Sequence, residues 1–302
     1  MMSSINFKHS IIFFNLCILI SPIYHQISYT LIIFCLFLIL ILGISHGSLD
    51  NIKGEKLLKL IGYKSKYLFY LSYVFISLLI IFSWLIFPNL VLLTFLIVAA
   101  YHFGKEDTVF KVKKGFLLNE ILFFFKGSSV IIAPLLFQRS STNEIFATLN
   151  FYVFEGSFFN NSSLIIFLVL SLVSSIYLSV GKSIELKNIM LLDYFSIIIL
   201  NIFLSPILAF TIYFCFLHSI RHSFSLINEM DRSFKRGLKK FIMKAIPLTL
   251  ITGLIFLISI YFLNNLYNID EAIYKVIFIG LASLTFPHIL LEYLLEKNEK
   301  RT

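Results

Sequence analysis

Long apolar runs are the feature that most constrains the fold of this chain. About 20 apolar residues cross a hydrocarbon core of ~30 Å as one helix. Three runs are long enough for two crossings, and residues that end helices interrupt each: 10–46 at 22–28, 67–104 at 88–89 and 190–224 at 201–206. Single crossings are expected at 116–137, 162–180, 241–263 and 274–295. The sequence therefore predicts an all-α, polytopic transmembrane helical bundle of about ten spans.

The composition excludes a soluble globule. Of the 302 residues, 59% are hydrophobic and only 14% are charged, and the mean hydropathy is +0.91, which leaves too little polar surface to cover a soluble fold. We expect a single integral-membrane domain over residues 1–302, surrounded by the lipid bilayer. The net charge of +9 would suggest nucleic acid in a soluble domain. Here the lysines occupy short loops, so no nucleic-acid partner is expected.

The distribution of basic residues predicts the orientation. Of the 25 Lys and Arg residues, all but a few lie in segments that ten spans would place on one face: the N-terminal tail, 50–66, 105–115, 181–189, 225–240 and the stretch after 295. The opposite face has only Arg139, in the segment 138–161. By the positive-inside rule both termini are predicted to be cytoplasmic, in a multi-pass protein of the inner (plasma) membrane.

Five of the seven histidines lie in or at the ends of apolar segments: His46, His102, His218, His222 and His288. An unpartnered imidazole is costly there, and binding a metal ion among membrane helices would satisfy it. His218 and His222 form an HxxxH motif, whose two side chains share a helix face, although this spacing also arises by chance. The other two histidines, His9 and His25, are predicted to lie in a tail and an outer turn, without a role.

Carboxylates follow two of these histidines by about one helical turn. Asp50 follows His46 in HGSLD, and Glu106 and Asp107 follow His102 in HFGKED. Such carboxylates can accept the N–H of a metal-ligating imidazole. A solvated turn at the basic membrane surface explains them equally well.

Charged residues also occur inside the predicted spans. Asp193, Arg221 and Lys126 either face the interior of the bundle or extend to an interface. Extension to the interface suits Lys126 and Arg221 slightly better, and no catalytic role is expected for them.

Four histidine motifs resemble those of a known family. GISHGSLDN, YHFGKED, LHSIRHS and TFPHILLEY are similar, in order and in span arrangement, to the motifs of the Brp/Blh family, the integral-membrane β-carotene 15,15′-dioxygenases that accompany microbial rhodopsins. Two positions depart from the family pattern: Ser45 stands where proline is frequent, and Asn51 where histidine is common.

The resemblance implies a mononuclear non-haem Fe(II) centre. Such a centre would use dioxygen to cleave the central double bond of β-carotene, or of a related carotenoid, into two retinal molecules, with a functional link to a microbial rhodopsin. The implied iron ligands are His46, His102, His218 and His222. His288 would be a fifth ligand or a residue near the site, and Asp50 and Asp107 would orient ligating imidazoles.

Two other classes of function stay open at this stage. A di-iron membrane lipid hydroxylase or desaturase would need about eight histidines or carboxylates in several clusters, and this chain has one HxxxH motif. A non-enzymatic metal- or haem-binding membrane transporter would place its ligands near the middle of the bilayer. The predicted ligands gather instead towards one face.

Overall fold

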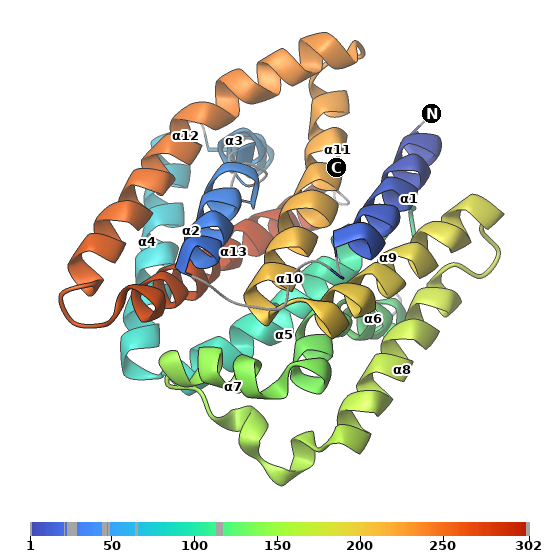
Figure 1. Ribbon diagram of the computed structural model, residues 1–302. Coiled ribbons are helices and arrows are strands. Elements are labelled where there is room, and N and C mark those ends of the chain that lie inside the picture. Colours follow the sequence, from blue (N-terminus) through green and yellow to red (C-terminus); the bar gives the residue numbers. More distant parts are fainter. Residues whose placement is uncertain are drawn as a thin grey trace. The chain divides into compact units, whose positions relative to one another are not determined.

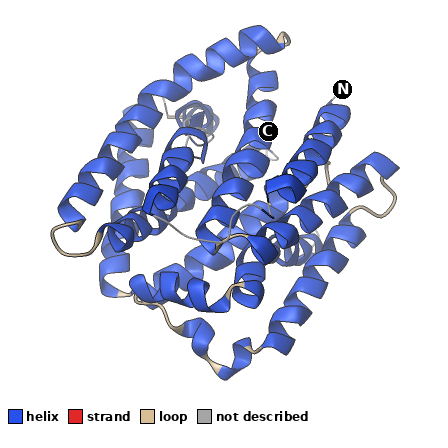
Figure 2. Ribbon diagram, viewed as in Figure 1, coloured by secondary structure: helices blue, strands red, loops and turns tan. Residues whose placement is uncertain are grey.

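The computed structural model is almost entirely helical (Figures 1 and 2). It describes residues 2–20, 22, 29–43, 47, 49–63, 66–112 and 117–299, and within these ranges it contains no strand. The prediction of an all-α fold is therefore confirmed. This outcome follows from the apolar sequence, because in a bilayer each backbone N–H and C=O must find its partner within the protein.

Short loops join the helices (Figure 2). In chain order the longer elements are α1 (Met2–Ile20), α2 (Tyr29–Leu38), the π-helix η2 (Ile39–Gly43), α3 (Asp50–Leu60), α4 (Lys66–Ile86), α5 (Pro88–Glu106), α6 (Leu117–Phe137), α7 (Arg139–Thr148), α8 (Asn161–Leu178), α9 (Ile184–Phe203), α10 (Pro206–Ile212), the π-helix η6 (Tyr213–Ser219), α11 (Ile220–Met230), α12 (Phe234–Leu263) and α13 (Ile269–Glu299). Two 3₁₀ turns, Val153–Glu155 and Ser157–Phe159, precede α8.

Eight helices in the described ranges are long and apolar enough to cross a membrane: α4, α5, α6, α8, α9, the continuous helix α10–η6–α11, α12 and α13. The chain is therefore a membrane protein by the length and composition of its helices. Two shorter apolar helices, Ser4–Ile20 and Leu31–Gly43, occupy the positions of the other two predicted spans. The count of ten and the side that each loop faces stay predictions.

The helices break at two of the proline-containing interruptions that the sequence predicted. Pro88 is the first residue of α5 and Pro206 the first of α10. Proline suits this position because the first helical N–H has no partner within the helix. The interruption predicted at 22–28 lies, except for Pro22, outside the described residues.

Two helices occupy segments that the sequence predicted as loops. α3 lies in the basic segment 50–66, and α7 lies in 138–161. Both are too polar to be recognised by hydropathy, and packing stabilises them instead: Leu57 and Leu58 of α3 are buried, and α3 packs against α4 and α13.

The chain divides into two compact units. Unit 1 comprises residues 1–39 and 96–222, and unit 2 comprises residues 40–95 and 223–302. In unit 1, α6 packs against α8 and α9, α1 packs against α9, and α10 contacts α2. Small residues allow this close packing, since Ser10, Ser171 and Ser196 are fully buried at helix surfaces.

In unit 2, α13 packs against α3, α4 and α12. The outer surfaces of α4 and α12 are apolar: Leu85 is 74% exposed and Leu250 is 67% exposed. Exposed apolar surface of this extent is unfavourable in water but matches lipid chains.

Candidate metal centre

The predicted histidine ligands belong to both units. His102, His218 and His222 lie in unit 1, and His288 lies in unit 2. His46 lies outside the described residues, so its placement stays a prediction.

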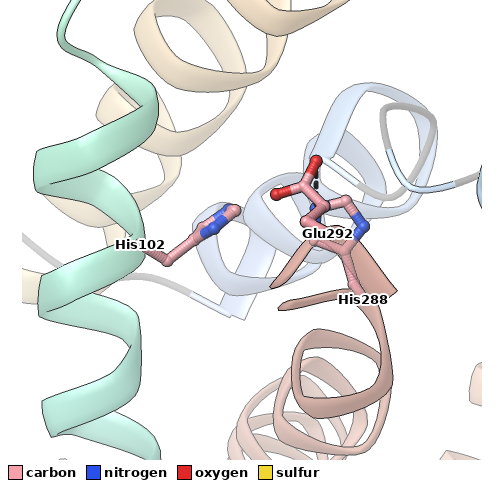
Figure 3. A group of neighbouring side chains, drawn as sticks. All are labelled: His102, His288 and Glu292. Carbon is pink, nitrogen blue, oxygen red and sulfur yellow. Dashed lines mark ion pairs between the residues drawn. The ribbon is translucent and has the colours of Figure 1, made fainter. Parts of the chain in front are cut away.

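The imidazole of His218 is enclosed by aromatic rings. Its ring centroid lies 5.4 Å from that of His102, which projects from α5 (Figure 3) and is 5% exposed. Phe103 packs against it edge-on at 4.9 Å, and Phe214 stacks on it with an interplanar angle of 15°. With 1% of its surface exposed, the His218 ring has little freedom to turn.

The HxxxH motif begins in a π-helix. His218 belongs to η6, whereas His222 belongs to the first turns of α11. π-Helical turns are frequently found at functional sites. A side chain from α1 supports this turn, because Nε2 of His9 lies 2.9 Å from the carbonyl oxygen of Phe216. The prediction that His9 lies in a tail was therefore wrong: it is on α1, in contact with η6.

Asp107 joins the end of α5 to His218. Its Oδ1 lies 3.0 Å from Nδ1 of His218, and its Oδ2 accepts a hydrogen bond of 2.6 Å from the hydroxyl of Tyr213. Burial would raise the pKa of the Asp107 carboxyl, but the imidazole of His218 and two buried cations nearby hold that pKa below its usual range. An ionised carboxylate only accepts hydrogen bonds, so Nδ1 carries the proton and Nε2 is the atom that can bind a metal.

A second carboxylate at the same helix end faces the other histidine of the motif. Oε2 of Glu106 lies 3.4 Å from Nδ1 of His222. Both imidazoles of the HxxxH motif thus direct Nδ1 towards carboxylates that the C-terminal end of α5 supplies. The ring nitrogens of these two histidines and His102 do not all lie within 4.8 Å of one another in the described part of unit 1.

A buried ion pair lies beside the motif. Two nitrogens of Arg221 contact the carboxylate of Asp193 at 2.6 and 3.0 Å, and the hydroxyl of Ser10 lies 2.9 Å from both partners. Arg221 is 5% exposed and Asp193 is 4% exposed. The interpretation that Arg221 extends to an interface was therefore wrong, because a bidentate partner on α9 holds it inside unit 1.

Lys126 is also buried, contrary to the same interpretation. Its ammonium group donates to the carbonyl oxygen of Gly104 at 3.2 Å and to the hydroxyl of Thr108 at 3.0 Å, so it binds the C-terminal turn of α5. Lys126, Asp107 and Asp193 line a cavity of about 20 Å³. A cavity of this size has room for about one water molecule, and it is far too small for a polyene.

Two glycines let α5 and α6 approach closely. A Cβ atom on Gly104 would collide with the carbonyl oxygen of Phe123, and one on Gly127 would collide with the carbonyl oxygen of Ala100. The glycine beside His102 therefore has a steric reason to lack a side chain. This contact fixes the helix end that carries Asp107.

Unit 2 holds His288 by a similar set of contacts. Nδ1 of His288 lies 2.8 and 2.9 Å from the two carboxylate oxygens of Asp50, and the hydroxyl of Tyr73 lies 3.0 Å from Oδ2 of Asp50. One turn further along α13, Glu292 pairs with His288 at 3.7 Å (Figure 3) and with Lys53 at 2.7 Å. The sequence placed Asp50 beside His46, whereas the structure pairs it with a histidine more than 200 residues away.

The tyrosines of these contacts were not found by sequence reasoning. Tyr213 precedes His218 by five residues, and Tyr73 lies in the middle of an apolar span. Neither position has a motif that distinguishes it from the other 13 tyrosines. Glu292, in contrast, stands within the quoted motif TFPHILLEY and is recognisable from its i, i+4 spacing to His288.

Fold and contacts together define a class: a polytopic helical membrane protein whose buried histidines are oriented by carboxylates. The family model described as beta-carotene 15,15′-dioxygenase matches residues 37–296, and the chain belongs to this family. A protein from an uncultured marine bacterium, 66A03, named beta-carotene 15,15′-dioxygenase, is 26% identical over 279 residues, which cover 87% of this chain and 94% of the relative. No solved structure matches. The resemblance inferred from the four motifs is thereby confirmed.

Proposed function

We propose that this protein is a β-carotene 15,15′-dioxygenase that cleaves the central double bond of β-carotene, or of a related carotenoid, with dioxygen. One oxygen atom would go to each of the two carbons, giving two retinal molecules. The observation that carries the proposal is the family match, because residues 37–296 include all five histidines that the sequence singled out.

The proposed cofactor is Fe(II), held by His46, His102, His218 and His222. Membership of a dioxygenase family suggests a metal cofactor, and imidazole nitrogens are suitable iron ligands. When bound, the iron would supply the redox chemistry that activates dioxygen. The donor set fits: a carboxylate at Nδ1 leaves Nε2 of His218 to face a metal, and the same reasoning applies to His222 beside Glu106.

The protein's own contribution would be position and exclusion of water. The aromatic rings around His218 shield it from water, with 1% of the residue exposed. A lipophilic polyene can enter a helical membrane protein sideways from the bilayer, and rigid aromatic walls can hold it so that only its centre reacts. We further propose an inner (plasma) membrane location with cytoplasmic termini, and a supply of retinal to a microbial rhodopsin.

Expression in a bacterium that produces β-carotene tests this function. Conversion of the orange carotenoid to retinal, measured by chromatography, is the expected result. Replacing His102 or His218 by alanine should abolish retinal formation and reduce bound iron, whereas His25→Ala, outside the predicted ligand set, should leave both unchanged. Folded, iron-loaded protein that leaves the carotenoid intact would contradict the proposal.

A further inference from the structure

Basic side chains gather around the first turns of α12, in unit 2. Residues 229–244 contain six cationic side chains and only two acidic ones. The cationic residues, which we call the basic cluster, are all exposed: Arg232, Lys235, Arg236, Lys239, Lys240 and Lys244. Asp231 pairs with Arg236 and Lys240. Among the described residues, no acidic side chain pairs with the other members of the cluster.

We propose that the basic cluster is a binding surface for the headgroups of anionic phospholipids, and that the acyl chains of the bound lipid lie along the apolar outer face of α12. This role goes beyond the proposed function and depends on neither the metal nor the carotenoid. Three features of α12 support it: the direction in which the cluster faces, the length of the helix, and the change of its outer surface from cationic to apolar.

Packing against α11 determines the direction in which the basic cluster faces. Gly237 and Phe241 are one turn apart and both are buried, so they belong to the inner face of α12. A Cβ atom on Gly237 would collide with the carbonyl oxygen of Ile227 on α11, and Phe241 shares an apolar cluster with Ile227. Lys235 and Lys239, also one turn apart, therefore project from the opposite face.

Asp231 holds the turn that leads into α12. Its Oδ1 accepts a hydrogen bond of 2.9 Å from the backbone N–H of Ser233 and lies 3.2 Å from Nε of Arg236. Its Oδ2 accepts a hydrogen bond of 2.8 Å from the ammonium group of Lys240. One carboxylate thus orders two of the cations, and the cluster as a whole stays positively charged.

The length of α12 places the basic cluster at the depth of the lipid headgroups. The helix has 30 residues, and those from 245 to 263 include no charged side chain. At the rise of an α-helix this uncharged part is about 28 Å long, which matches a hydrocarbon core of ~30 Å. The turns that precede it extend the helix by about 16 Å, into the layer that contains the lipid phosphates.

The outer face of α12 becomes apolar directly after the basic cluster. Met243 is 64% exposed and Leu250 is 67% exposed, one turn and three turns beyond Lys239. A phospholipid has the same two parts side by side, a phosphate that attracts Lys and Arg and chains that contact apolar side chains. Free phosphate or an acidic segment of a soluble protein would use the charges alone. The adjacent apolar surface therefore favours a lipid.

Lipid binding to the purified full-length protein in a neutral detergent tests the proposal. Native mass spectrometry measures the affinity for phosphatidylglycerol and for zwitterionic phosphatidylcholine. We expect a preference for phosphatidylglycerol that weakens as the ammonium acetate concentration rises, because ions screen exposed charges. Each surface cation contributes about fivefold, so Lys235→Gln/Lys239→Gln should lose roughly 25-fold in affinity. The matched control, Lys59→Gln/Lys187→Gln, removes two exposed lysines outside the cluster and should retain the wild-type affinity.

Four results would overturn the proposal. The first is equal affinity for the two lipids, and the second is an unchanged affinity in Lys235→Gln/Lys239→Gln. The third is an equal loss in the control variant, which would show attraction by overall charge. The fourth is displacement of phosphatidylglycerol by equimolar inorganic phosphate, which would show a site for free phosphate. If the double variant fails to fold, Lys239→Gln alone decides, with an expected loss of about fivefold.

Discussion

The buried ion pair between Arg221 and Asp193 predicts a large and specific loss of stability. In Arg221→Met the guanidinium disappears, and the Asp193 carboxylate, 4% exposed, retains only the hydroxyl of Ser10 among these contacts. Removing one partner of a buried, hydrogen-bonded pair costs about 3–5 kcal/mol. The bidentate contacts of 2.6 and 3.0 Å place this pair in that class.

The loss is measurable as a shift in melting temperature in detergent. At roughly 2–4 °C per kcal/mol for chains of this size, the variant should melt about 6–20 °C below the wild type. Arg236→Met is the matched control, because Arg236 is exposed and its pair with Asp231 is solvated; it should leave the melting temperature unchanged. The double variant Arg221→Met/Asp193→Leu should recover most of the loss, since an apolar pair replaces both charges.

Two results would refute this reasoning. Arg221→Met could have the same melting temperature as the wild type, which would mean that water or structural relaxation already screens the charges of the pair. Alternatively, the double variant could lose the sum of both single losses, which would show that each side chain acts through separate contacts.

Three further predictions concern the α5–α6 contact, the carboxylate on His218 and the topology. Gly127→Ala should destabilise the protein by at least about 1–3 kcal/mol, because its Cβ would collide with the carbonyl oxygen of Ala100; thermal unfolding measures this. Asp107→Asn should weaken Fe(II) binding roughly 10–100-fold without abolishing it, and an unchanged affinity would exclude an orienting role. Single cysteines placed in 225–240 should be labelled from the cytoplasmic side only, and labelling from outside would invert the predicted topology.

The sequence predicted the features that depend on local composition. The helix breaks at Pro88 and Pro206 follow from neighbouring residues, and the structure confirms them. Eight of the predicted spans are helices long and apolar enough to cross a membrane, and the family match confirms the resemblance that the histidine motifs indicated. The partners of Asp50 and Asp107 do not follow in this way. Each lies one turn after a histidine, yet the structure pairs each with a histidine far along the chain.

The sequence does not reveal these partners because they depend on how each helix is rotated about its own axis. A helix in water reveals its buried face as an apolar stripe, but a membrane helix is apolar on all sides. Hydropathy therefore cannot show whether Lys126 or Arg221 points inward. A charged side chain in the bilayer can avoid the cost of desolvation in two ways, by extending to the interface or by pairing with a buried partner. Which of the two occurs depends on the residues that neighbouring helices present.

This dependence on neighbouring helices also explains how a short HxxxH motif can be placed accurately. Residues 216–221 are held by three different helices of unit 1: α1 contacts the carbonyl oxygen of Phe216 through His9, the end of α5 binds His218 through Asp107, and α9 binds Arg221 through Asp193. The π-turn that begins the motif would be unfavourable in isolation. These contacts stabilise it, so the orientation of the imidazoles depends on the packing of unit 1 rather than on the helical spacing of the motif. Variants on α1 or α9, distant from the motif in sequence, should therefore affect metal binding together with stability.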